Sequence, residues 1–188
     1  NNEFGVPLTI LGAQSPGKSV VGWLKILFSK PKNVPEVFVL EFAIDHPGDM
    51  KYLCEIVQPT ISVFTRVSPV HVEFFRSVEH LAEEKALMLE QTDKDGLCVL
   101  HAADPLVLCL TKHANAPIST YGFSASSDLR ATDYVLQTRD DFSFEPGELF
   151  SKVNVTIGAP DQPLTMQLND VLGKSSVSSI LPAVVVAR

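Results

Sequence analysis

Three ionisable residues stand in or beside apolar segments, where a charge needs a chemical reason. Glu41 interrupts the apolar run of residues 37–44, and His71 follows the run of residues 61–67. Lys85 shares the helical spacing of the apolar residues around it. Carboxylate and imidazole groups are common ligands of metal ions. The three side chains are therefore a candidate site for a divalent cation and phosphate oxygens.

Of the three residues, Lys85 most needs a chemical explanation, because its helical spacing directs its side chain toward the sheet. The apolar positions of its segment are Val78, Leu81, Ala82, Met88 and Leu89. An inward ammonium group would repel a metal ion, whereas a carbamylated lysine would be an anionic oxygen ligand. Each residue also has a structural interpretation: a salt bridge for Glu41, an incidental loop position for His71, and a snorkelling side chain for Lys85.

The elements that must position these residues predict an α/β fold. Apolar, β-branched runs predict strands, and 3.6-residue periodicity with capping signals predicts helices. Strands are expected at residues 37–44, 61–67, 97–100 and 118–121, and helices at 47–57, 77–91 and 106–113. This alternation predicts a mainly parallel sheet with right-handed crossovers. Glu41 and His71 then lie toward or beyond the carboxyl ends of strands, where open α/β sheets bind ligands.

The pattern changes after Gly122, where alternating segments predict a small antiparallel sheet. Its strands are expected at residues 130–137, 142–144, 153–157 and 164–168. A last helix should begin near Gly173, with Pro182 bending or delaying it. One domain results, with a parallel α/β part at 1–122, the antiparallel sheet at 123–172 and the start of the last helix at 173–188.

Composition limits the function classes. The 188 residues are 45% hydrophobic and 20% charged, which excludes wholesale disorder, and a net charge of −7 argues against a general basic surface for nucleic acid. No apolar run has the length of a membrane span. Three cysteines without metal-site spacing indicate reduced thiols in a cytoplasmic protein. The chain lacks an initial methionine and stops within an apolar run, so we expect a domain truncated at both ends.

Five motifs occur in an order that resembles the central domain of the Mur ligase family. They are Asn-Asn-Glu-Phe-Gly-Val-Pro-Leu-Thr at 1–9, Leu-Glu-Phe-Ala-Ile-Asp-His-Pro-Gly-Asp at 40–49, Ser-Pro-Val-His-Val-Glu at 68–73, Glu-Lys-Ala at 84–86 and Val-Leu-His-Ala-Ala-Asp-Pro at 99–105. The similarity is greatest to the branch that adds D-alanyl-D-alanine, and it extends from Asn1 into the last helix.

The resemblance implies a P-loop NTPase-like fold and an ATP- and Mg²⁺-dependent amide ligase of peptidoglycan synthesis, and hence of cell-wall biogenesis, cell shape and cell division. Such an enzyme adds an amino acid or D-Ala-D-Ala to a UDP-MurNAc-peptide through an acyl phosphate. The rest of the enzyme would be amino- and carboxy-terminal domains of the same chain, without which this domain should be inactive.

The resemblance also implies residue roles. Glu41 and His71 would each bind a magnesium ion, and Lys85 would be the carbamylated lysine that helps to hold the second ion. His101 and Asp104 would contact the nucleotide, and Asn1 and Asn2 would lie near the nucleotide-sugar substrate. The chain departs from the family at His101, where relatives have asparagine, at Ala103, where they have an acid, at Leu87, where they have glutamate, and at residues 173–176, where a Gly-Lys-His-Asn-like start reads Gly-Lys-Ser-Ser. A degenerate, non-catalytic binding module is therefore an alternative.

Residues 12–19 match the phosphate-loop pattern G-x-x-x-x-G-K-[ST]. A P-loop phosphotransferase or NTPase with Lys18 on the phosphates and Ser19 on magnesium is thus a second alternative. Pro16 counts against it, because proline has no N–H to donate to a phosphate. In the family order the loop falls in a variable connection, which predicts an amphipathic helix that packs on a partner domain or on the domain's own edge. Its apolar residues are Trp23, Leu24, Leu27 and Phe28.

Overall fold

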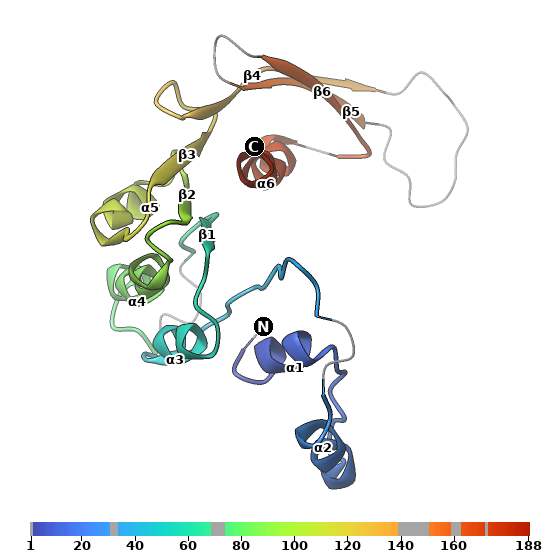
Figure 1. Ribbon diagram of the computed structural model, residues 1–188. Helices are drawn as coiled ribbons and strands as arrows, with labels where there is room; N and C mark the ends of the chain where they lie inside the picture. The colour runs from blue at the N-terminus through green and yellow to red at the C-terminus, as the bar shows by residue number, and fades with distance from the viewer. Residues whose placement is uncertain (1, 31–33, 69–73, 139–150, 159–162, 172) are drawn as a thin grey trace.

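A six-stranded mixed sheet with helices on both faces forms the body of the protein (Figure 1). The structure is a computed structural model that describes residues 2–30, 34–68, 74–138, 151–158, 163–171 and 173–188. Within the sheet the strands follow one another in chain order, β1-β2-β3-β4-β5-β6. The predicted α/β architecture, mainly parallel with an antiparallel part toward the carboxyl terminus, is confirmed.

The parallel part consists of β1 (Ile61–Phe64), β2 (Leu97–His101) and β3 (Ile118–Gly122). Phe64 pairs with Leu100, and His101 pairs with Tyr121. The carboxyl ends of the three strands consequently lie at one edge of the sheet, as parallel pairing requires.

The antiparallel part is continuous with the parallel part, because β4 (Leu129–Thr138) pairs parallel to β3. β4 then pairs antiparallel with β5 (Ser151–Gly158), which pairs with β6 (Leu164–Asn169). A register shift between Thr132 and Val135 contains Asp133 at φ 50°, as in a β-bulge. The strand predicted at 142–144 lies outside the described residues.

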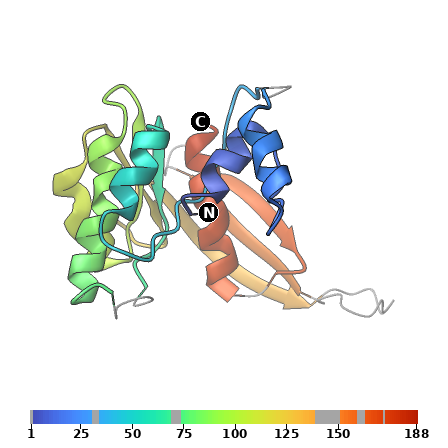
Figure 2. The same ribbon diagram turned by 90° about the horizontal axis from the view of Figure 1, so that it is seen from below.

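Two helical layers cover the sheet (Figures 1 and 2). One face carries α4 (Val78–Gln91), α5 (Pro105–Cys109) and the 3₁₀ helix η1 (Leu110–His113), with α3 (Asp49–Ile56) against α4. The other face carries α6 (Gly173–Val186), which begins where predicted and continues through Pro182. Ser77 accepts a hydrogen bond from the His80 N–H and so caps α4.

The alternation of side chains along β2 divides the core between these layers. Cys98 and Leu100 pack with Ala86 and Leu89 of α4. Val99 points the other way and packs with Leu181 of α6. All six are almost completely buried. β2 is therefore a central strand, which explains its uninterrupted apolar sequence.

The strand predicted at residues 37–44 does not form. The segment has no regular structure, and β1 is the first strand in the described residues. Leu40, Phe42 and Ile44 pack in a cluster with residues of α3 and α4, whereas Val39 is 91% exposed. Every second side chain of the apolar run therefore packs against the helices. A strand also requires a hydrogen-bonded neighbouring strand, and the run has none in the described residues.

Two helices precede this segment, α1 (Gly5–Leu11) and α2 (Val20–Leu27). The phosphate-loop alternative requires a strand in the place of α1, so this helix contradicts it. α2 confirms the predicted helix in the connection. In the described residues no helix combines the length and apolarity needed to cross a membrane. The three cysteines are free thiols.

Candidate functional site

His101 and Asp104 meet at the carboxyl edge of the parallel strands. His101 is the last residue of β2, and its ring centroid lies 5.1 Å from that of Tyr121 on β3. Gly122 has φ 148°, and a Cβ atom built there would lie 3.8 Å from Nε2 of His101. The imidazole consequently lies next to Tyr121 and Gly122 at the end of β3.

Asp104 fixes the backbone around this ring. Its Oδ1 accepts the N–H groups of Leu106 at 3.0 Å and Val107 at 3.3 Å, which caps α5. Its Oδ2 accepts the N–H of Val67 at 3.1 Å, three residues beyond β1. One carboxylate therefore ties the chain after β1 to the start of α5. It so shapes the edge of the sheet where β1, β2 and β3 have their carboxyl ends, which we call the strand-end edge.

Three effects set the charge of His101. Burial lowers its pKa most, the Asp104 carboxylate raises it, and the Arg66 guanidinium lowers it. With a pKa below its ordinary value, His101 is mainly a neutral imidazole at pH 7. Sequence reasoning missed Arg66, although a cation directly after the carboxyl end of a buried strand was a signal for it. A neutral ring beside a guanidinium suits an aromatic base attached to an anionic group.

The capping role of Asp104 leads to a stability prediction. Asp104→Ala should lower the free energy of unfolding by about 1–3 kcal/mol, since two helix-terminal N–H groups and the Val67 N–H lose their acceptor. Urea-induced unfolding of the chain measures the change. Asp95→Ala is the control, because Asp95 is an exposed turn residue whose loss should change the free energy by less than about 0.5 kcal/mol. Equal losses in both variants would contradict the role of Asp104.

Lys85 lies on the buried face of α4, as its spacing predicted. It stands one turn from Leu81, Ala82 and Leu89, which are almost completely buried. The lysine is itself half-buried, and burial lowers its pKa. A lowered pKa increases the fraction of neutral amine, which is the nucleophilic and carbamylatable form.

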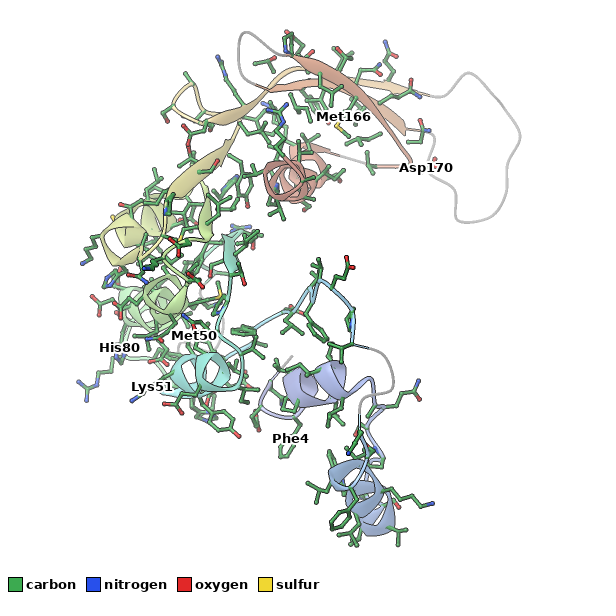
Figure 3. All side chains as sticks on the ribbon, viewed as in Figure 1. Phe4, Met50, Lys51, His80, Met166 and Asp170 are labelled. Atoms are coloured by element: carbon green, nitrogen blue, oxygen red, sulfur yellow. The ribbon has the colours of Figure 1, made fainter. Side chains whose placement is uncertain are left out.

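Glu84, the residue before Lys85, organises the loop that leads into α3. Its Oε1 accepts the N–H groups of Gly48 at 2.8 Å and Met50 at 3.3 Å. Within the loop, Oδ2 of Asp49 accepts the N–H of His46 at 2.8 Å. Figure 3 shows Met50 where α3 meets α4, and it is almost completely buried. α4 thus holds both the start of α3 and the end of the segment that carries Glu41.

Glu41 is exposed on that segment, and it also has at least one interaction partner within the protein. Because the predicted strand does not form, Glu41 does not lie toward the carboxyl end of a sheet strand. Its neighbours Leu40 and Phe42 pack in the cluster that also contains Leu87 and Met88 of α4. The segment of Glu41 and the helix of Lys85 are therefore joined by apolar packing as well as by Glu84.

The remaining predicted residues divide between described and undescribed parts of the chain. Oδ1 of Asn2 accepts the N–H groups of Phe4 and Gly5, each at 3.3 Å, in the turn that leads into α1. His71 and Asn1 lie outside the described residues. Of the His, Cys, Asp and Glu side chains that the structure describes, no three come together in a group able to hold a metal ion. The assignment of Glu41, His71 and Lys85 to a cation thus stays a prediction.

Comparison with known proteins gives a match over almost the whole chain. The Mur ligase middle domain family matches residues 5–187. A UDP-N-acetylmuramoyl-tripeptide–D-alanyl-D-alanine ligase of Mycobacterium tuberculosis is 31% identical over 112 residues, which cover 60% of this chain and 18% of that protein. The Bacillus subtilis ligase of the same name is 26% identical over 133 residues, covering 71% of this chain and 24% of that one. The chain spans about a fifth of the length of such relatives.

Solved structures show the same fold at low sequence identity. The MurF ligase from Thermotoga maritima in complex with ADP has a TM-score of 0.68 and 21% identity, covering 97% of this chain and 41% of that one. MurF from Acinetobacter baumannii has a TM-score of 0.62 and 18% identity, covering 77% of this chain and 29% of that one. The sheet and its helical layers are therefore a known architecture.

Proposed function

Because the chain belongs to the Mur ligase middle domain family, we propose that it is the central, ATP-binding domain of a cytoplasmic amide ligase of peptidoglycan synthesis. The enzyme adds an amino acid or D-Ala-D-Ala to a UDP-MurNAc-peptide. The observation that carries this proposal is the family match over residues 5–187. The strand-end edge with His101 and Asp104 supports it, because open α/β sheets bind nucleotides there.

The strand-end edge would take the adenine end of ATP. His101 would stack on the base or hydrogen-bond to it, since its lowered pKa keeps the ring neutral. Arg66 brings positive charge to the same edge, which favours an anionic nucleotide. Asp104 would act mainly by holding the edge in shape, because both of its oxygens accept backbone N–H groups. Asn1 and Asn2 would lie on the side of the nucleotide-sugar.

Glu41, His71 and Lys85 would hold the magnesium ions. An unmodified Lys85 does not suit such a site, because its cationic ammonium would repel the magnesium ion. Carbamylation resolves this difficulty: the neutral amine forms a bond to the carbon of CO₂ and releases one proton to solvent, leaving an anionic carbamate. The lowered pKa of Lys85 supports this step, because only the neutral amine reacts. Bound magnesium would neutralise charge on the phosphate oxygens.

The overall reaction would consist of two displacements. A carboxylate oxygen of the UDP-MurNAc-peptide bonds to the γ-phosphorus of ATP, and ADP leaves. The incoming amine then bonds to the acyl carbon, and inorganic phosphate leaves as the amine loses its proton. Family relatives carry further domains, since this chain spans about a fifth of their length. We therefore assign turnover to the full-length protein.

The decisive experiment is a ligation assay with the full-length protein. Supplied with MgATP, UDP-MurNAc-tripeptide and D-Ala-D-Ala, it should release phosphate only when both substrates are present. Replacing them with UDP-MurNAc and L-alanine tests the specificity of other relatives, which are UDP-N-acetylmuramate–L-alanine ligases. Phosphate release that is independent of both acceptor pairs would contradict the proposal. Calorimetric binding of MgATP by the full-length protein would count against the degenerate binding module suggested by Leu87, His101 and Ala103.

A further inference from the structure

α2 presents an apolar surface that the described residues leave exposed. Its members, with the residue that follows the helix, form the α2 patch: Val20, Val21, Leu24, Leu27 and Phe28. At the helical rotation of each residue they fall within one arc of about 120°. Leu27 is 74% exposed and Phe28 is 86% exposed. This is a continuous apolar stripe, unlike the scattered exposed leucines of an ordinary surface.

The opposite side of α2 is the side that contacts the protein. The indole N–H of Trp23 donates to the Gly17 carbonyl at 3.1 Å, and its ring lies 6.0 Å from that of Phe4. A Cβ atom built on Gly22 would lie 2.5 Å from Cβ of Pro16, so proline and helix are in close contact. The loop at residues 12–19 therefore fixes the orientation of α2, and this role accounts for its glycine and proline without a phosphate.

Figure 1 shows α2 beyond α1 and away from the sheet, and Figure 3 shows Phe4 at the start of α1 near α2. The α2 patch thus lies on an outer part of the molecule. The contacts of Trp23 fix the orientation of α2, and in this orientation the patch faces outward.

The charge around the α2 patch is opposite to that of the rest of the chain. Residues 4–35 contain four lysines and no acidic residue, in a chain whose formal net charge is −7. Lys18, Lys25 and Lys30 are exposed, and Lys25 borders the apolar arc on the helix. An apolar stripe with an adjacent tryptophan and flanking lysines is typical of a helix that lies in a membrane interface.

We propose that the α2 patch binds the surface of an anionic lipid bilayer, with Leu27 and Phe28 among the acyl chains and the lysines on the headgroups. Lipid fits better than a second copy of this chain, because a symmetric contact would bring the lysines of both copies together. The stripe also lies parallel to the helix axis, so α2 would lie in the plane of the interface. The proposal does not depend on the ligase assignment.

Vesicle co-sedimentation of the full-length protein tests the proposal. We expect binding to vesicles of phosphatidylglycerol and phosphatidylcholine in equal parts, and at least about tenfold weaker binding to phosphatidylcholine alone. Added salt should weaken the anionic binding. Subtracting the fluorescence spectrum of Trp23→Phe from that of wild type isolates the emission of Trp23. This emission should shift to shorter wavelength when anionic vesicles are added. Equal affinity for both kinds of vesicle, or a Trp23 emission that vesicles do not change, would overturn the proposal.

Matched variants distinguish binding through the α2 patch from nonspecific adsorption to vesicles. Leu24→Asp should weaken vesicle binding by at least about tenfold, whereas Leu136→Asp on β4 should not. The two leucines are 48% and 49% exposed, so they are comparable in accessibility. Lys25→Gln with Lys30→Gln should weaken binding by about tenfold or more. Equal effects of the two leucine variants on vesicle binding would refute the assignment. So would a protein that does not bind vesicles but self-associates with rising concentration, if only Leu24→Asp abolishes this self-association.

Discussion

Replacing Lys85 with methionine should lower the turnover of the full-length ligase by at least about 100-fold, the usual effect of losing a group that stabilises charge in a transition state. The expectation rests on where the lysine lies. It shares the buried face of α4 with Leu81, Ala82 and Leu89, and burial lowers its pKa. Even at a half-buried position, partial desolvation disfavours the charged form of the amine and so opposes folding.

The same variant distinguishes function from folding. In the folded chain the pKa of Lys85 lies below its ordinary value, so between the two values the unfolded chain binds more protons. Stability therefore rises with pH across that window, and the charged amine opposes folding below it. Methionine keeps the apolar stem and removes this opposition. Lys85→Met should fold at least as stably as wild type at neutral pH, as thermal unfolding can measure.

Two further measurements complete this test. Lys51→Met is the control, since Lys51 is an exposed lysine of the neighbouring helix α3 and should leave turnover near the wild-type value (Figure 3). A short carboxylic acid added to Lys85→Ala should restore part of the activity if the wild-type side chain is carbamylated, because the acid supplies the missing carboxylate oxygens. Near-normal turnover of Lys85→Met would refute the role of the lysine.

Local signals predicted the parts of the fold that depend on neighbouring residues. The helices expected at 77–91 and 106–113 form, and Ser77 and Asp104 cap their amino ends. The inward direction of Lys85 followed from its spacing on one helix. These features could be read from the sequence because each depends on residues at most one or two turns away.

Features that depend on distant residues could not be read in this way. An apolar run at 37–44 fits a strand buried on both faces, but a strand also needs a paired neighbour, which spacing does not reveal. Glu84 binds Gly48 from 36 residues away. Asp104 contacts Val67 across 37 residues, and Arg66, in the segment that follows β1, lowers the pKa of His101 at the end of β2. The strand-end edge is thus formed by long-range contacts, of which the sequence indicates only the individual residue types.

Glu41 leads to the second large prediction, for a side chain whose surroundings differ from those expected. Glu41→Ala should lower the turnover of the full-length ligase by at least about 100-fold, because the proposed magnesium ion loses a carboxylate ligand. Glu41→Gln should behave similarly, since an amide keeps the shape but not the charge. Both variants should also need more magnesium for half-maximal rate. Initial rates across a magnesium titration measure both effects.

The exposed position of Glu41 makes this prediction easy to interpret. Substitutions at exposed positions usually change stability by less than about 0.5 kcal/mol, so a large loss of turnover would not come from unfolding. Glu36→Ala is the matched control, because Glu36 is an exposed carboxylate on the same segment that we place outside the site. Similar magnesium titrations for Glu36→Ala and Glu41→Ala would contradict the cation assignment. Leu40 and Phe42 pack with α4 while the Glu41 side chain between them is exposed, so substituting Glu41 leaves the packing of the segment in place.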